Sequence, residues 1–291
     1  MRILCSVIRA RQSFAPYYPA RAPHAPPLHM PGGAGRTMGG RRESANRSDA
    51  WRREARNSGY RTRSAFKLKQ IQEKFGVIRR GDTVLDVGCH PGGWSQVAVE
   101  SAGGDGVVIG VDLKGCAPVD GCTFVVGDIT EEGTQQRIRD TLDGEVLRVV
   151  VSDISPSLTG QYEMDQAISI ELVCAVFDFV FPLMDSGGVL VTKVFRGRGI
   201  EALISAANTR FSKVQRFSPD ASRNSSSETY LICRNRKVKP SKGTGGKSVQ
   251  ELVDETLTED GFVLPADEVD ERQEAGRVGF RLVRSTSDEG E

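Results

Sequence analysis

The sequence predicts a doubly wound α/β fold, in which a seven-stranded, mostly parallel sheet carries helices on both faces. Three observations support this fold class. Apolar runs of strand length alternate with segments of helical periodicity from residue 62 onward. Several of these runs are continuously apolar, which is typical of parallel strands buried on both sides. Four of them end in an aspartate, and ligands of open α/β sheets bind at the ends of such strands.

The predicted elements follow one another in a regular order. Helices are expected over residues 49–59 and 62–75, and each ends at or before a glycine. Strands are predicted at residues 83–86, 106–112, 122–128, 147–153, 187–195, 211–217 and 228–234. Helices are predicted between them, over residues 95–102, 130–142, 164–184 and 199–209. We expect the last two strands to form an antiparallel hairpin, unlike the parallel strands before them.

A glycine-rich loop follows the first strand, in the stretch TVLDVGCHPGGW at residues 83–94. Glycines let the backbone approach a ligand, and the N-terminus of the following helix offers free N–H groups. The spacing is not G-x-G-x-x-G, because Pro91 precedes the glycine pair and Trp94 follows it. This pattern argues against a pyrophosphate site and predicts a flat pocket with an aromatic wall. For the loop alone, an ordinary strand–loop–helix turn without a ligand is the alternative.

Charge is distributed unevenly, although the formal net charge is only +1. Residues 1–59 hold eleven Arg and three acidic residues, whereas residues 248–291 hold four Arg and thirteen acidic residues. We predict a disordered N-terminal extension over 1–42, a folded domain over 43–238, and an acidic, mostly disordered tail over 239–291. An arginine-rich start suits a mitochondrial transit peptide, but its six prolines break any amphipathic helix, so we expect a cytoplasmic protein.

The cysteine and histidine positions exclude several classes of protein. The six cysteines form no C-x-x-C pair and the three histidines add no zinc-ligand spacing, so no metal site is expected. Cys174 and Cys233 lie in apolar runs, which predicts that they are core residues. No uninterrupted run of 18 apolar residues occurs, so no membrane span is expected. We expect a monomer.

Acidic residues stand at the ends of successive predicted strands: Asp86, Asp112, Asp128 and Asp153. Buried unpaired carboxylates are costly, so such residues seldom serve packing alone. Asp112 follows Gly88 by 24 residues, close to the spacing at which an acid binds ribose hydroxyls. Several acids would repel a pyrophosphate, so a nucleoside carrying a cationic sulfonium, S-adenosyl-L-methionine, fits better than NAD. Asp128 could bind the adenine amine.

Six short motifs, in this order and spacing, resemble the RlmE/FtsJ family of ribose 2′-O-methyltransferases. They are FKLKQIQEKF, VLDVGCHPGGWSQV, VGDIT, SDISPS, TKVFRG and SSSETY. The resemblance covers about residues 45–236 and implies a Rossmann-like class I methyltransferase fold with S-adenosyl-L-methionine as donor. The family's catalytic set falls on Lys67, Asp153, Lys193 and Glu228. Its cofactor-binding residues fall on Gly92, Trp94, Asp112, Asp128 and Asp153.

The chemistry of the four implied catalytic residues suits this role. A ribose hydroxyl is a poor nucleophile until a base accepts its proton, and an amine can do so only when neutral. Burial and the neighbouring charge of Lys67 both favour a neutral Lys193, the implied proton acceptor. Two positions depart from the family's usual residues: Cys89-His90 replaces small residues, and Ser157 stands where Asn is common.

The resulting hypothesis is methylation of a ribose 2′-hydroxyl in structured RNA. By resemblance, the target is a uridine in the A-loop of large-subunit (23S) ribosomal RNA, and transfer RNA is the alternative. A nicotinamide dehydrogenase is a second hypothesis, disfavoured by the missing G-x-G-x-x-G. A non-catalytic RNA-binding module is a third, disfavoured by the complete set of implied catalytic residues.

Two basic segments are predicted to border the RNA. Arginines interleaved with Trp51 and Tyr60 precede the second helix: Arg52, Arg53, Arg56, Arg61 and Arg63. Residues 195–198, which include two more arginines, leave the strand that carries Lys193. Arginine with aromatic residues is the composition of a nucleic-acid surface. A solvated helix face is the alternative for this composition alone.

Overall fold

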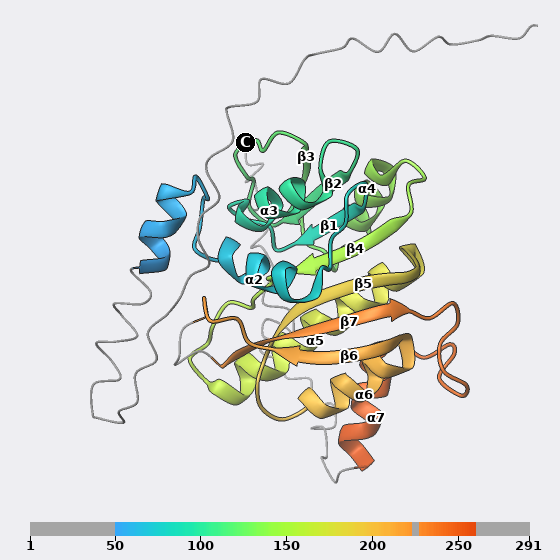
Figure 1. The fold of residues 1–291 in the computed structure, drawn as a ribbon. Helices are drawn as coiled ribbons and strands as arrows, with labels where there is room; N and C mark the ends of the chain where they lie inside the picture. Colours follow the sequence, from blue (N-terminus) through green and yellow to red (C-terminus); the bar gives the residue numbers. More distant parts are fainter. Residues whose placement is uncertain (1–49, 223–226, 260–291) are drawn as a thin grey trace, which may run out of the picture. The chain divides into compact units, whose positions relative to one another are not determined.

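One sheet forms the centre of the folded chain (Figure 1). The computed structural model describes residues 50–222 and 227–259, and in these residues seven strands run in the order β3-β2-β1-β4-β5-β7-β6. The strands are β1 Thr83–Val87, β2 Val107–Asp112, β3 Cys122–Val126, β4 Leu147–Ser152, β5 Met184–Phe195, β6 Phe211–Phe217 and β7 Glu228–Arg236. The predicted fold class is confirmed.

Helices cover both faces of the sheet. They are α2 Ala65–Phe75, α3 Gly93–Ala102, α4 Glu132–Leu142, α5 Tyr162–Val180, α6 Ile200–Arg210 and α7 Val249–Glu259, and residues 50–57 are also helical. Side chains alternate along a strand, so β1 feeds both cores. Val84 packs in the core beneath α2 and α3, whereas Leu85 and Val87 pack in the core shared by α4 to α7.

The order of the strands creates a ligand crevice beside β1. β1 pairs in parallel with β2 on one side and with β4 on the other, so the chain reverses its direction across the sheet at this point. Open α/β sheets bind ligands outside the carboxyl ends of strands at such a switch point. The loops after β1, β2 and β4 therefore meet at one edge.

The last strands are antiparallel, as the sequence predicts. β7 lies between β5 and β6 and runs against both. Because β7 runs opposite to β5, the start of β7 lies beside the end of β5, and Glu228 is paired in register with Phe195. The hairpin thus brings a residue from late in the chain to the same edge as the parallel strand ends.

The helix predicted over residues 164–184 is shorter at its C-terminal end. α5 ends at Val180, a 3-10 turn covers Phe181–Leu183, and β5 begins at Met184, before the predicted start at residue 187. Pro182 lies in that turn, and proline cannot continue an α-helix because it has no N–H and clashes with the preceding turn. The early start of β5 is accommodated by a shift in register against β4, between Leu147 and Val149.

The apolar composition of α5 reflects its place in the core. By length and composition alone, the segment Tyr162–Leu183 could cross a membrane, which is weak evidence because core helices pass the same test. Val173, Cys174 and Phe177 are fully buried against the sheet and neighbouring helices. Cys233 on β7 is also fully buried, so both cysteines predicted to lie in the core do so.

The predicted disorder of the tail is wrong for residues 239–259. α7 packs on α5 and α6, because Val249, Leu252 and Val253 form an apolar stripe at helical spacing that is buried in the core. The Asp178 carboxylate accepts a hydrogen bond from the Val249 N–H at 2.7 Å and fixes the start of the helix. The folded part of the chain therefore extends at least to residue 259. The disorder predicted for residues 1–42 and 260–291 lies outside the described residues.

Candidate active site

Four residues that are distant in sequence meet at the carboxyl edge of the sheet. Lys67 lies in the first turn of α2, Asp153 directly follows β4, Lys193 is on β5, and Glu228 begins β7. We call these four residues the lysine–carboxylate cluster. Lys67 Nζ lies 2.9 Å from Glu228 Oε2 and 4.0 Å from Asp153 Oδ1, and Lys193 Nζ lies 3.2 Å from Asp153 Oδ1. The structure thus brings together all four predicted catalytic residues.

Lys193 is held by a single neighbour in two ways. Its amine donates to the main-chain oxygen of Asp153 at 2.8 Å, and the Asp153 carboxylate lies beside the same amine. The side chain of Lys193 is only 5% exposed, because α2 and α3 cover this face of the sheet. A lysine near the end of a strand often points to solvent, and the burial of Lys193 excludes that role.

The charges within the cluster keep both carboxylates ionised. Burial alone would raise the pKa of Asp153, but Lys193, Lys67 and a hydroxyl donor outweigh it, so this pKa lies below its usual range. Burial would likewise raise the pKa of Glu228, but Lys67 and then Lys193 lower it. Both groups therefore remain hydrogen-bond acceptors at neutral pH.

Tyr230 is a further member of the site that was not predicted from the sequence. It is fully buried on β7, and its hydroxyl donates to Asp153 Oδ1 at 2.7 Å. Burial, followed by the two nearby carboxylates, raises the pKa of Tyr230 well above its ordinary value, so the hydroxyl keeps its proton. The signal was present in SSSETY, because a residue two positions after Glu228 on a strand shares its face.

Trp94 does not form the aromatic pocket wall that the sequence predicts. Its side chain is 2% exposed, its ring stacks on Tyr230 with centroids 5.6 Å apart, and its indole N–H donates to the Ser64 carbonyl at 2.8 Å. Ser64 directly precedes α2. Trp94 therefore supports the cluster by linking α3 to the start of the helix that carries Lys67.

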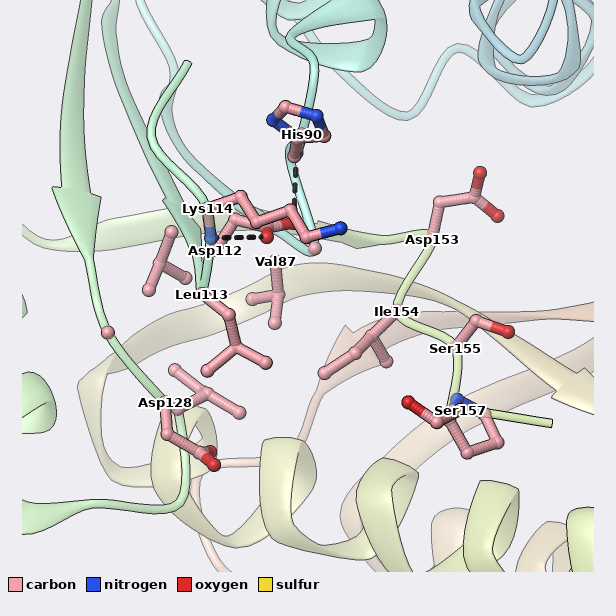
Figure 2. Close-up of a pocket in the computed structure, with 15 residues that line it drawn as sticks. Val87, His90, Asp112, Leu113, Lys114, Asp128, Asp153, Ile154, Ser155 and Ser157 are labelled. Atoms are coloured by element: carbon pink, nitrogen blue, oxygen red, sulfur yellow. Dashed lines mark hydrogen bonds between the residues drawn. The ribbon is translucent and has the colours of Figure 1, made fainter. Parts of the chain in front are cut away.

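A pocket of about 330 Å³ lies next to the cluster at the switch point (Figure 2). We call it the strand-end pocket. It is formed by the loops after β1, β2, β3 and β4, and its polar side chains include Asp112, Asp128, Asp153, Ser155 and Ser157. Asp153 belongs to both the pocket and the cluster. Three of the predicted cofactor-binding residues, Asp112, Asp128 and Asp153, therefore line one cavity.

The Asp112 and Asp128 carboxylates are oriented by the main chain. Asp112 accepts hydrogen bonds from the N–H groups of His90 at 3.0 Å and Lys114 at 2.9 Å, which Figure 2 shows as dashed lines. Asp128 accepts from the N–H and the hydroxyl of Thr130, at 2.9 and 2.8 Å. These contacts hold each carboxylate at the pocket. Each oxygen of Asp112 keeps a second lone pair for a ligand hydroxyl or amine, whereas Asp128 accepts both bonds at Oδ1 and leaves Oδ2 for the ligand.

Asp86 lies buried at the carboxyl end of β1, close to the pocket loops. Ser95 donates to its Oδ2 at 2.7 Å, whereas Oδ1 is buried and has no hydrogen-bond partner among the described residues. Burial, which outweighs the Ser95 hydrogen bond, raises the pKa of Asp86 to about 7. The sequence pattern marks it as a strand-end acid, but only the structure shows that it is fully enclosed.

Arg61 joins two of the pocket loops instead of forming part of an exposed basic surface. Its guanidinium donates to the carbonyls of Pro91 at 3.0 Å, Ala117 at 2.6 Å and Pro118 at 2.5 Å. It fits because Gly92 has no side chain: a Cβ there would lie 2.6 Å from the Arg61 guanidinium. Gly92, a predicted cofactor-binding residue, also has a φ of +105°, which glycine tolerates.

Most of the other predicted RNA-facing arginines lie on two segments. Arg52, Arg53 and Arg56 are exposed on the helix formed by residues 50–57. This helix is attached to α2 by an aromatic contact between Trp51 and Phe66, whose centroids are 5.0 Å apart. On the other segment, the exposed Arg196 donates to the Ser218 hydroxyl at 2.7 Å.

Comparisons with known proteins agree with this geometry. A family model of FtsJ-like methyltransferases matches residues 60–236. The chain is 41% identical over 212 residues to the ribosomal RNA large subunit methyltransferase E of Halobacterium salinarum, covering 72% of this chain and 81% of that protein. It is 37% identical over 207 residues to the protein of the same name from Methanobrevibacter smithii, covering 70% of this chain and 98% of that protein.

A solved structure shows the same similarity in three dimensions. It is a Plasmodium falciparum protein described as a ribosomal RNA methyltransferase, with a TM-score of 0.56 and 26% sequence identity. The alignment covers 61% of this chain and 98% of that chain. Since the family model spans more than half of the sequence, and the motifs within it build one site, this protein belongs to the FtsJ-like methyltransferase family.

Proposed function

We propose that this protein transfers a methyl group from S-adenosyl-L-methionine to a ribose 2′-hydroxyl of ribosomal RNA. The proposed target is a uridine in the A-loop of the large subunit. The observation that carries this proposal is Lys193, a buried amine bonded to Asp153 at the border of the strand-end pocket. The names of the similar proteins support ribosomal RNA as the substrate class.

The strand-end pocket suits S-adenosyl-L-methionine in size and chemistry. Its volume of about 330 Å³ is in the range of small-molecule sites. Asp112 could bind the ribose hydroxyls and Asp128 the adenine amine, because both carboxylates have free lone pairs at the cavity. The backbone at Gly92 and Trp94, where α3 begins, could hold the methionine end. When bound, this cofactor supplies a methyl group on a positively charged sulfur.

The cluster can accept the proton that the ribose hydroxyl must lose. A neutral Lys193 has two N–H bonds, and the two oxygens of Asp153 that lie beside its amine can accept both. The lone pair then points away from Asp153 and is available as a base. With Lys193 neutral, the four residues carry a net charge of −1, and proton uptake makes them neutral. The nearby carboxylates therefore stabilise the protonated product of this step.

Lys67, Glu228 and Tyr230 position this base instead of replacing it. Glu228 binds Lys67, and Tyr230 donates to Asp153, so each partner of Lys193 is itself held. Preorganisation of this kind lowers the entropy that must be lost when the hydroxyl is aligned with the methyl group.

The proposal is tested with purified protein, S-adenosyl-L-methionine labelled in its methyl group, and RNA from cells that lack this gene. We expect label in large-subunit ribosomal RNA, at a single uridine of the A-loop when 2′-O-methylation is mapped. If the label appeared only in transfer RNA, the substrate would be transfer RNA and not ribosomal RNA. Binding of NAD but not S-adenosyl-L-methionine in calorimetry would reject methyl transfer altogether.

A further inference from the structure

A second polar pocket lies at the opposite, amino edge of the sheet. It has a volume of about 300 Å³ and is bordered by the C-terminal end of α2, the starts of β1 and β4, and the hairpin of β6 and β7. Its remaining border is the bend in β5 at Gly187 and Gly188, where the register against β4 shifts. Its charged side chains are Arg79, Asp82, Arg148, Lys213 and Arg234. We call it the amino-edge pocket. The proposed reaction does not use any of these residues.

Within the part of the chain that the structure describes, three of the four cations of the amino-edge pocket lack a carboxylate partner. Arg148 is paired with Asp185 and lies 4.0 Å from Asp82. Asp82 also accepts the main-chain N–H of Arg79 at 2.7 Å, so this carboxylate is already engaged. Among the described residues, no acidic side chain lies within 4.0 Å of the charged groups of Arg79, Lys213 or Arg234. The pocket therefore carries an excess of positive charge.

The hairpin places two of these cations directly opposite each other. Lys213 on β6 is paired in register with Arg234 on β7, so both side chains project from the same face. Like charges in this position destabilise an antiparallel pair. In addition, the Arg234 Nε is buried without a hydrogen-bond partner among the described residues, although Nη2 donates to Gln215 at 3.1 Å. The Arg234 guanidinium also lies over the Phe75 ring, 5.8 Å from its centroid, but this contact supplies no full negative charge. A bound anion would neutralise the two cations.

The backbone keeps the amino-edge pocket open. The bend in β5 passes through Gly187 and Gly188, and both line the cavity. A Cβ at Gly188 would lie 2.9 Å from the Asp185 carbonyl and 3.1 Å from the Arg148 carbonyl, so a side chain cannot be placed there without a shift. Because these two glycines have no side chains, they leave the cationic groups of the pocket accessible to a ligand.

We propose that the amino-edge pocket binds a phosphate group of the RNA backbone, an inference that rests on the proposed function. α2 connects the two sites, because Lys67 lies near its start and Phe75, at its end, lines the pocket. Eight residues of helix span about 12 Å, the length of a few nucleotides. Exposed Lys74 follows Lys67 by seven positions, which places it on nearly the same side of α2, and its Nζ is 4.3 Å from the Phe217 ring centroid. A strand leaving the lysine–carboxylate cluster can follow this basic path.

Charge reversal at exposed positions tests the RNA contact. Lys213→Glu and Arg79→Glu are compared with Arg139→Glu, an exposed arginine on α4 that makes the same change in net charge on the opposite face of the sheet. The probe is a transcript of the ribosomal RNA domain that contains the A-loop, titrated at several salt concentrations. We expect each pocket variant to bind roughly tenfold more weakly and to lower the salt slope by about 0.7–0.9 for each phosphate that the variant no longer neutralises.

A stability measurement separates a ligand site from a general charge effect. Lys213→Glu should pair with Arg234 and raise the melting temperature, while it weakens RNA binding. Titration with inorganic phosphate, monitored by NMR, shows whether the pocket binds free phosphate or only the phosphate groups of RNA. RNA affinity equal to that of the Arg139→Glu control would overturn the proposal, and so would loss of phosphate binding without any loss of RNA affinity. RNA binding is measured without methyl transfer, so the result can be interpreted even if the protein does not catalyse the proposed reaction.

Discussion

The lysine–carboxylate cluster and the strand-end pocket share Asp153 but are held together differently. In the cluster, each charged group lies within 4.0 Å of an opposite charge. In the pocket, Asp112 and Asp128 accept hydrogen bonds from main-chain N–H groups and a hydroxyl. Asp86, behind the pocket, keeps one carboxylate oxygen without a partner among the described residues.

This difference separates chemistry from ligand binding. With Lys193 protonated, the cluster is charge-balanced and hydrogen-bonded within the protein, so its geometry does not depend on a ligand. Lys193 must give up this proton before it acts as the base. The pocket exposes carboxylates that are oriented but not neutralised by the hydrogen bonds they accept, which suits a cationic ligand. Substitutions in the cluster should therefore affect turnover, whereas substitutions in the pocket should affect cofactor affinity.

The largest expected effect is in the cluster. Lys193→Ala removes the proposed base, so we expect methyl transfer to fall by about 10²–10⁴-fold. The affinity for S-adenosyl-L-methionine, measured by calorimetry, should stay the same. Lys242→Ala, at an exposed turn, is the control. A variant with near-normal turnover would remove Lys193 from the role of base, and a large loss of cofactor affinity would remove the separation between the two regions.

The next effect concerns the pH dependence of stability through Asp86. Burial raises its pKa in the folded protein from 3.8 to about 7, so the folded state binds the proton more tightly than the unfolded chain does. The contribution of Asp86 to the free energy of unfolding is fully present below pH 3.8. It is lost as the pH rises to about 7, which lowers the free energy of unfolding by up to roughly 4 kcal/mol.

Asp86→Asn should remove this dependence while keeping a partner for Ser95. The difference in unfolding free energy between the variant and the wild type, measured by urea denaturation from pH 4 to 8, should shift in favour of the variant as pH rises. A difference that is constant with pH would show that Asp86 is ionised in the folded protein throughout this range.

Asp112→Ala tests the pocket directly. We expect cofactor affinity to fall by about 1.5–3 kcal/mol, the range for a charge-assisted hydrogen bond. Turnover at saturating cofactor should change little, because Asp112 does not contact the cluster. Calorimetry and a comparison of kcat with KM measure the two quantities. Unchanged affinity would show that the ribose of the cofactor lies elsewhere.

The smallest effect is expected at Arg61, and it decides between two roles. Arg61→Lys keeps the charge but lacks the planar guanidinium, whose two amino groups reach carbonyls of both loops, so the loops of Pro91 and Pro118 should loosen. We expect cofactor affinity to fall by about 1 kcal/mol, with little change in RNA affinity. Arg56→Lys, on the exposed helix, should change neither. If Arg61→Lys instead weakens RNA binding alone, Arg61 belongs to the RNA surface.

Local sequence patterns are enough to predict the order and type of most elements of the sheet. Continuous apolar runs and glycine stops are local signals, and they correctly predict β1, β2 and β4. The antiparallel end of the sheet and the meeting of Lys67, Asp153, Lys193 and Glu228 were also anticipated, the latter through resemblance to a family. The roles of these residues stay predictions until the variants are measured.

Features that depend on contacts between distant segments could not be predicted from local patterns. Composition indicates a disordered tail, but α7 is ordered because α5 and α6 bury its apolar stripe. Arg61 lies in a segment whose arginines and aromatic residues are typical of an RNA-binding surface. However, its side chain binds carbonyls that lie 30, 56 and 57 positions away in the sequence. Lys213 opposes Arg234 only because of the register of the last hairpin. No local pattern encodes such pairings, since they are set by the packing of the whole sheet.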